Sequence, residues 1–300
     1  MPLVRVRHPL FSGLNGWLRS NEYQVDVSSG NAEVLVSNPD TLVAHIAGDV
    51  DRLLKAGRET CQNLSNVSAL GKTSPAWGAI QAYYAAFYYV SAFLKLSSRN
   101  LAYVRTSDLQ EIRRQIRAAP SGGPNIATGQ WRFDLTPNAA RVSIRKPINS
   151  DGVHEGTWKE LRSLLETIEA GLSSLPFTLE ERQQVGNEIG ALARLTDGVL
   201  GTPFLSSTRN DIQYRQLLES WTPISKSNKS IDFKDLSSAI WKNESTATFQ
   251  GDLGKTELEK FIRRCLNLCS VVHACVEFVS AKEPGSFLKS SYGKFHSSLM

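Results

Sequence analysis

Apolar side chains recur along this chain at intervals of three and four residues, the spacing of one face of a helix. The clearest run begins at Asp40, which is placed to cap a helix, and continues to about Ser65. A second run begins at Ser74, with Pro75 in the first helical position that proline favours, and ends near Ser98. Three further segments share the periodicity: Trp158–Leu172, Leu179 to about Leu195, and Lys255–Lys282.

Four places along the chain carry the sequence signature of a helix start. In each, Ser or Thr is followed three residues later by Glu or Gln, so that both side chains can satisfy amides of the first turn. The pairs are Ser107/Gln110, Thr157/Glu160, Thr178/Glu181 and Thr256/Glu259.

The segment from Ser74 to Ser98 has the pattern of a central helix. Its small residues, Gly78, Ala82, Ala85 and Ala86, recur at helical spacing and allow a neighbouring backbone to approach closely. We therefore predict an all-α fold, an antiparallel helical bundle built around Ser74–Ser98 and Lys255–Lys282. We expect residues 1–300 to form a single domain.

Three segments depart from the helical pattern. Residues 1–38, with one candidate strand at Glu33–Val36, are expected to form a short N-terminal arm. Residues 99–156 are predicted to be a basic insertion, in which Trp131–Leu135 and Arg141–Ile144 alternate as the strands of a small hairpin do. The Ser-rich residues 284–300 are expected to form a flexible tail.

The positive charge of the chain is concentrated in this insertion. The net charge is +5, but residues 97–150 contain nine basic and three acidic residues, which leaves the remainder at −1. Tyr103, Trp131 and Phe133 lie among the basic residues, an arrangement compatible with phosphates on arginines and bases on aromatic rings. The alternative is a solvated surface that only aids solubility. The candidate nucleic-acid-binding residues are Arg113, Arg114, Arg117, Arg132, Arg141, Arg145 and Lys146.

The cysteine and histidine pattern predicts core packing rather than a metal site. Cys265, Cys269 and His273 follow each other at intervals of four residues, but the first and last are about 12 Å apart on a helix, too far for one zinc ion. The same face is apolar, and the four cysteines do not form a spaced disulfide framework. We expect neither a metal nor another cofactor.

Sequence signals for other classes of protein are weak. The start of the chain has basic residues but no continuous apolar segment typical of a secretory signal, and we expect a cytoplasmic protein. Residues 73–94 are uncharged, yet their proline, glutamine and tyrosines favour a buried helix over a membrane span. The Gly-Lys-Thr triplets at 71–73 and 254–256 lack the upstream glycine of a phosphate-binding loop.

One short segment, Ser206–Arg215, combines residues that bind anions. With Thr208 as N-cap, Arg209 would occupy the first position of a helix, where free amides and the helix dipole already favour an anion. Asn210 and Tyr214 are four residues apart and share a helix face. The alternative interpretation is structural, because Asp211 and Arg215 also have the spacing of a surface ion pair.

The helix WGAIQAYYAAFYYVSAFLKL, followed later by RNDIQYR, resembles the HEPN superfamily, all-α bundles often found in bacterial toxin–antitoxin and antiviral systems. The signature of that family is an Arg, a polar residue directly after it, and a His after four to six intervening residues. Arg209 matches the Arg and Asn210 the polar residue, whereas Tyr214 stands where active members carry His. The resemblance covers residues 41–98 and 157–281 in helical layout, plus this motif.

The resemblance implies a metal-independent endoribonuclease. In active members two motifs meet across a homodimer, the Arg steadies the phosphate and the His moves the proton of the 2′-hydroxyl. By analogy Arg209 would be the phosphate clamp, Asn210 an orienting group and Tyr214 a hydrogen-bond donor or weak proton-transfer group. A phenol is ionised in only about one part in a thousand at pH 7, which makes it a poor general base.

The alternative function is that of a catalytically inactive HEPN-like module. Such a module would sense a nucleic acid or bind another defence protein. For either function we expect RNA or a nucleotide as ligand, a homodimer, a cognate antitoxin or defence partner, and no membrane.

Overall fold

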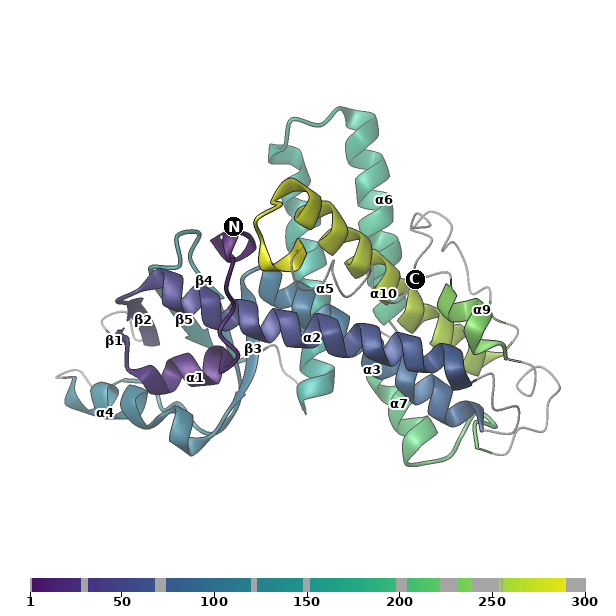
Figure 1. The fold of residues 1–300 in the computed structure, drawn as a ribbon, viewed down its shortest axis with the longest axis horizontal. Coiled ribbons are helices and arrows are strands. Elements are labelled where there is room, and N and C mark those ends of the chain that lie inside the picture. Colours follow the sequence, from purple (N-terminus) through teal and green to yellow (C-terminus); the bar gives the residue numbers. More distant parts are fainter. Residues whose placement is uncertain are drawn as a thin grey trace. The chain divides into compact units, whose positions relative to one another are not determined.

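The computed structural model describes residues 2–27, 32–67, 74–119, 123–147, 152–197, 204–221, 231–238, 254 and 256–289 (Figure 1). The chain divides into two compact units. Unit 1 contains Met1–Lys55, Ser91–Gly156 and Val276–Met300, and unit 2 contains Ala56–Val90 and Thr157–Cys275. The unit boundaries fall within four helices: α2 (Pro39–Val67), α3 (Pro75–Leu96), α5 (Val153–Gly171) and α10 (Glu257–Lys282).

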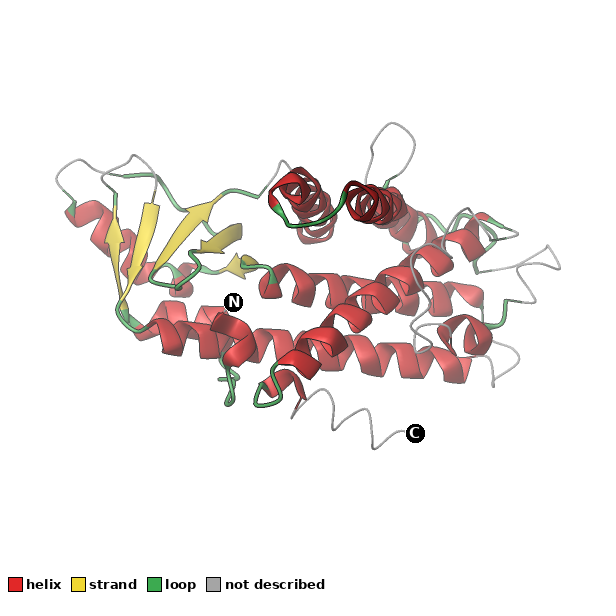
Figure 2. Ribbon diagram, turned by 90° about the horizontal axis from the view of Figure 1, so that it is seen from above, coloured by secondary structure: helices red, strands yellow, loops and turns green. Residues whose placement is uncertain are grey.

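Unit 1 contains a five-stranded antiparallel sheet, so the prediction of an all-α fold is wrong (Figure 2). Its strands, in spatial order, are β1 (Tyr23–Asp26), β2 (Ala32–Val36), β5 (Arg141–Arg145), β4 (Gly129–Leu135) and β3 (Arg99–Val104). The segment expected to be an arm thus supplies two strands, and the segment expected to be an insertion supplies three. The expected hairpin is present as β4 and β5.

The sheet has one buried and one open face, because successive residues of a strand point to opposite sides. Val34, Phe133 and Val142 are fully buried on one side. Arg132 and Arg145, which are register partners across β4 and β5, lie on the other. Tyr103 on the edge strand β3 also belongs to the open side and is 54% exposed.

Helix α1 (Gly13–Ser20) and the first part of α2 pack with the sheet in unit 1. Trp17 of α1 is fully buried, and its ring centroid lies 4.9 Å from that of Tyr23 in β1. On α2, a Cβ atom added to Gly48 would lie 2.0 Å from the carbonyl oxygen of Leu10. Glycine at this position therefore lets the N-terminal segment lie directly against the helix.

Side chains cover both edges of the sheet. The amide of Val25 in β1 donates to Oε1 of Gln115, at 2.6 Å, from helix α4 (Gln110–Ala118). On β3, the carbonyl of Tyr103 accepts from Nδ2 of Asn15 at 3.1 Å. Such bonds occupy strand groups that would otherwise pair with another chain.

Three short segments complete unit 1. They are the 3₁₀ helices η1 (Pro2–Arg5) and η3 (Thr106–Asp108), and residues 283–289 after α10. In the last of these, Phe287 is fully buried and its amide donates to the carbonyl of Val6 at 2.7 Å. The remainder of the expected tail, residues 290–300, lies outside the described residues.

In unit 2, α3 packs through Tyr83 against two other helices. The Tyr83 ring stacks on Phe261 of α10, with centroids 6.2 Å apart, and meets the ring of Trp158 in α5 edge-on at 5.7 Å. Nε1 of Trp158 donates to the Tyr83 hydroxyl at 3.1 Å. Burial raises the pKa of this phenol above its ordinary value. Gly78 on the same helix provides room for the ring of Phe233, which a Cβ would approach to 2.3 Å.

The other elements of unit 2 are η4 (Leu172–Ser174), α6 (Leu179–Thr196), α7 (Phe204–Gln213) and α9 (Phe233–Ser238). The predicted capping box of α6 is confirmed: the amide of Thr178 donates to Glu181 at 2.7 Å, and the amide of Glu181 donates back to Thr178 at 3.2 Å. The helix start predicted at Thr157 is wrong, because α5 already begins at Val153.

Within the described ranges one helix, α10, has the length and apolar composition needed to cross a membrane. Buried core helices share this length and composition.

The two faces of the sheet predict different responses to truncation. Phe133→Ala is expected to lower the free energy of unfolding by about 3–5 kcal/mol, because it empties a fully buried site. Tyr103→Ala on the open face is expected to change it by less than about 1 kcal/mol. Urea unfolding followed by circular dichroism measures both, and equal losses would contradict the assignment of the faces.

Candidate functional site

Arg209 lies in the second turn of α7, not at its start. The helix begins at Phe204, whose ring meets Phe261 at 6.3 Å and lies 4.4 Å beneath the guanidinium of Arg264. These contacts extend the helix N-terminal to Thr208, so the prediction that Thr208 is the N-cap is wrong. Arg209 consequently has no first-turn amides beside it and relies on side chains for its environment.

The guanidinium of Arg209 brings the three predicted motif residues together. Its Nη1 donates to Oδ1 of Asn210 at 2.9 Å and to the hydroxyl of Tyr214 at 3.4 Å. Its Nη2 donates to the hydroxyl of Tyr84, on α3, at 2.6 Å. We call Arg209, Asn210, Tyr214 and Tyr84 the Arg209 cluster.

The rings of Tyr84 and Tyr214 also lie close to the positive charge of Arg209. The guanidinium carbon lies 5.6 Å from the ring centroid of Tyr84 and 5.1 Å from that of Tyr214, within the range of cation–π attraction. Burial acts to lower the pKa of Arg209, but the hydrogen bond to Tyr84 and the nearby phenols outweigh it and raise the pKa above its ordinary value. The cluster therefore keeps a permanent positive charge.

Exposure differs sharply within the Arg209 cluster. Arg209 is only 8% exposed, whereas Tyr214 is 66% exposed and Asn210 is exposed as well. Within the described part of the chain, the buried Nε of Arg209 has no hydrogen-bond partner. The arrangement is a buried cation beneath a phenol and an amide, and it can donate several hydrogen bonds to an anionic oxygen.

The structural alternative for this segment is present too. Nη1 of Arg215 lies 2.9 Å from Oδ1 of Asp211, and the Arg215 side chain is 71% exposed. An exposed pair of this kind contributes little stability. It occupies the neighbouring positions of the helix and leaves the contacts of Arg209 unchanged.

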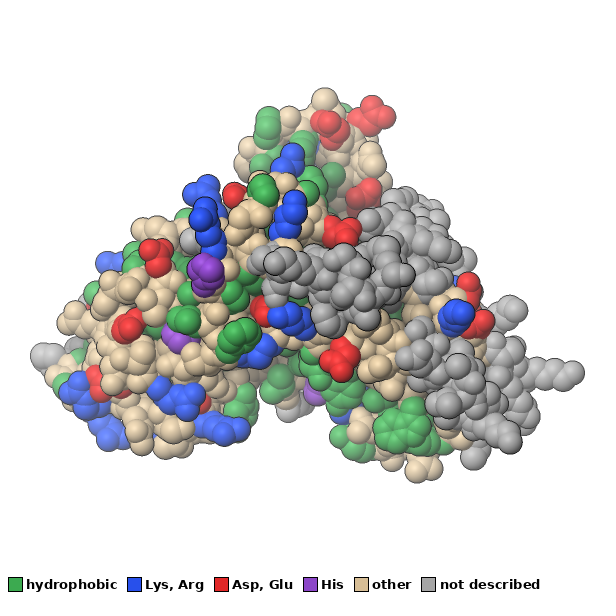
Figure 3. Space-filling view, viewed as in Figure 1, with side chains coloured by type: hydrophobic (Ala, Val, Ile, Leu, Met, Phe, Trp, Pro, Cys, Tyr) green, Lys and Arg blue, Asp and Glu red, His purple; other side chains and the backbone are tan. Residues whose placement is uncertain are grey.

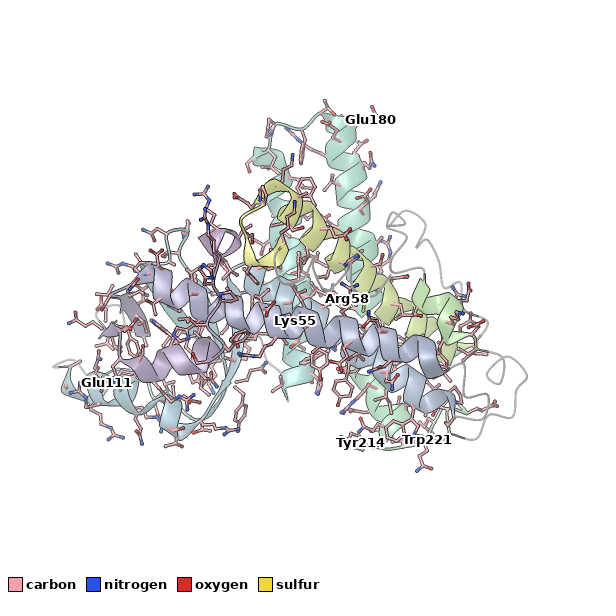
Figure 4. All side chains as sticks on the ribbon, in the orientation of Figure 1. Lys55, Arg58, Glu111, Glu180, Tyr214 and Trp221 are labelled. Carbon is pink, nitrogen blue, oxygen red and sulfur yellow. The ribbon has the colours of Figure 1, made fainter. Side chains whose placement is uncertain are left out.

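Aromatic residues beside the cluster were not predicted. Trp77, in the first turn of α3, is 54% exposed and meets Trp221 edge-on at 5.2 Å. Nε1 of Trp221 donates to the carbonyl of Ile212 at 2.8 Å, which holds this ring against the end of α7. Figure 4 shows Tyr214 and Trp221 at this end, and Figure 3 shows hydrophobic side chains gathered over it.

The spacing along α3 contained a signal for this surface. Trp77, Gln81, Tyr84 and Tyr88 follow one another at intervals of three or four residues, on a different side of α3 from the core residue Tyr83. These four positions mix polar and aromatic side chains, which is unusual for a helix that is otherwise apolar.

The candidate basic residues on and near α4 have protein partners of their own. Nε of Arg113 donates to the carbonyl of Ile126 at 2.8 Å. Arg114 binds Glu111 through two hydrogen bonds of 2.7 and 2.5 Å. That contact, followed by a bond from Gln115, lowers the pKa of Glu111 to about 2. Arg117 is exposed on the same helix.

The candidate residues on the sheet form ion pairs across its open face. Arg132 and Arg145 share Asp134, with N–O distances of 2.7 and 3.9 Å. Arg141 pairs with Glu33 of β2 at 3.2 Å. Lys146 instead lies 4.7 Å from the ring centroid of Trp131.

Two of the three aromatic residues expected among these arginines are not available to a ligand. Phe133 is fully buried and Trp131 is 6% exposed, because both lie on the buried face of the sheet. Only Tyr103 presents its ring on the open face.

Cys265, Cys269 and His273 lie in the core, each with at most 1% of its surface exposed. Burial raises the pKa of the Cys265 and Cys269 thiols, and Cys269 also contacts Cys61. Among the described residues, no group of three or more His, Cys, Asp or Glu side chains is arranged to hold a metal ion.

The geometry predicts that Tyr84 and Tyr214 contribute unequally to the free energy of unfolding. Tyr84→Phe is expected to lower the free energy of unfolding by about 1.5–3 kcal/mol, because it removes a partner of a buried charge. Tyr214→Phe is expected to change it by less than about 0.5 kcal/mol, because its longer bond is exposed to solvent. Urea unfolding of both variants tests this. A larger loss for Tyr214→Phe would show that the cluster is held from its exposed side.

No family model, curated protein or solved structure matches this chain. A function is therefore inferred from the motif, its surroundings and the distribution of charge.

Proposed function

We propose that the chain is a HEPN-like module that binds RNA through the Arg209 cluster and cleaves it inefficiently. The observation that supports this is the meeting of Arg209, Asn210 and Tyr214 at one guanidinium. Side chains at neighbouring positions on a helix surface need not contact one another, so the contacts of both Asn210 and Tyr214 with the Arg209 guanidinium are a specific feature of this segment. RNA, a partner defence protein and a homodimer remain parts of this proposal.

A phosphate diester suits the cluster chemically. A guanidinium provides charge-assisted hydrogen bonds to phosphate oxygens, and the hydroxyl and amide of the exposed neighbours add directional contacts. Tyr214 is the natural entry point, because its 3.4 Å bond to Arg209 is long and its ring is mostly exposed. Moving this side chain aside would open Nη1 to a ligand.

Efficient cleavage requires a general base, and the groups around the guanidinium are poorly suited to that role. The partners of Arg209 are two phenols and an amide. An imidazole is suited to accept a proton near neutral pH, whereas a phenol or an amide is not.

A second candidate function is the endoribonuclease of a toxin–antitoxin or antiviral system. It is favoured by the position of the Tyr214 hydroxyl, exposed and within 3.4 Å of the guanidinium, where active family members carry His. This function would require two motifs to meet in a homodimer, as the family resemblance implies.

The two functions are separated by incubating end-labelled RNA with the purified chain in EDTA. We expect RNA binding accompanied by only slow cleavage. Arg209→Lys should weaken binding about 10-fold or more, because lysine cannot reproduce the fork of hydrogen bonds. Tyr214→His should raise the rate of cleavage by about 10²–10⁴-fold, with 2′,3′-cyclic phosphate products, because it supplies a base poised near pH 7.

Arg114→Ala is the matched control, because it removes one exposed arginine far along the sequence from the motif. Rapid cleavage by the unchanged chain, lost in Arg209→Ala, would replace this proposal with the nuclease. RNA binding that is equally strong in both arginine variants would remove the Arg209 cluster from either function.

A further inference from the structure

The whole net charge of the chain lies in unit 1. This unit has 18 basic and 13 acidic residues, a net charge of +5, whereas unit 2 has 16 of each. Long-range attraction of a polyanion is therefore a property of the unit with the sheet and not of the unit with the Arg209 cluster.

The outward side chains of the sheet place cations in a regular array. Arg132 on β4 and Arg145 on β5 are register partners, and Arg141 lies four residues from Arg145 on the same strand. The side chains of Arg141 and Arg145 are 54% and 63% exposed. At the usual rise of a strand their backbones are about 13 Å apart.

Carboxylates contact the arginines of this face. Asp134 lies 2.7 Å from Arg132, whose side chain is 16% exposed, and 3.9 Å from Arg145. The pair of Arg141 with Glu33 is exposed. Exposed pairs contribute little stability, so a phosphate can exchange with the carboxylate at small cost.

An exposed ring adjoins the arginines. Tyr103 on β3 is the register partner of Gln130 on β4, two residues from Arg132. Diagonal neighbours of this kind are within about 7–8 Å, close enough for a base on the ring and its phosphate on the guanidinium. The hydrogen bond from Asn15 to the Tyr103 carbonyl fixes the strand that carries the ring.

We propose that this open face, on which Tyr103, Arg141 and Arg145 are exposed and Arg132 is partly buried, binds single-stranded RNA. Cations hold the phosphates and Tyr103 stacks on an unpaired base. A duplex does not suit the face, because its bases are already stacked on one another. The face is separate in sequence and in unit from the Arg209 cluster and goes beyond the function proposed for it.

The test uses fluorescence anisotropy with a fluorescein-labelled 12-nucleotide oligouridylate over a range of salt concentrations, with the full chain. Arg141→Ala combined with Arg145→Ala should reduce the slope of log affinity against log salt by about 1.4, or 0.7 for each phosphate contact. The matched control is Arg114→Ala combined with Arg117→Ala, which removes the same charge from α4. Its slope should be unchanged.

Tyr103→Ala should weaken binding about 10-fold with an unchanged slope, because stacking does not release counterions. Phe278→Ala is its control, since that ring is 66% exposed in the same unit but off the sheet. An effect of Phe278→Ala as large as that of Tyr103→Ala would overturn the stacking site. Equal slopes for the two arginine pairs would overturn the phosphate site.

Further ligands decide the class of partner. Tighter binding of the corresponding duplex, or of single-stranded DNA, would overturn the assignment to single-stranded RNA. Equal competition by polyglutamate would assign the face to an acidic protein instead. Arg209→Ala separates the two proposals, because loss of binding in that variant alone would retain the Arg209 cluster and reject the sheet face.

Discussion

Unit 2, the helical unit, depends on the burial of one side chain, Tyr83. Its ring stacks on Phe261 of α10, and its hydroxyl accepts from Trp158 of α5, so one residue of α3 sets the positions of two other helices. Because adjacent residues on a helix point about 100° apart, fixing Tyr83 in the core also fixes the direction of Tyr84. Tyr84 then meets Arg209 at 2.6 Å. The candidate site is in this sense a by-product of core packing.

The helices were predictable because their signals are local. Periodicity and a capping pair such as Thr178 with Glu181 lie within a few residues of one another, and these signals placed α2, α3, α6 and α10 close to their observed bounds. The sheet was not predictable by the same means. Val34 pairs with Val142, more than a hundred residues away, and nothing in either segment alone names its partner. A strand and a hairpin read separately therefore suggested an arm and an insertion instead of one sheet.

The candidate site shows the same division. The four-residue spacing of Asn210 and Tyr214 predicted that both share a face, and both contact Arg209. The burial of Arg209 was not predictable, because it depends on Tyr84 in a different helix. The start of α7 was misassigned for a similar reason: Phe204 extends the helix through a tertiary contact with Phe261, and this overrides the capping preference of Thr208.

The buried cysteines of the helical unit also have a consequence for its chemistry. Cys61, Cys265 and Cys269 are at most 1% exposed, and the raised pKa values of the Cys265 and Cys269 thiols keep them protonated at neutral pH. Alkylating reagents attack the thiolate, so in the folded state these two sulfur atoms are protected both by access and by protonation. The rate at which these thiols are alkylated therefore depends on how often the helical core opens. Alkylation of Cys265 and Cys269 thus reports local or global unfolding of unit 2.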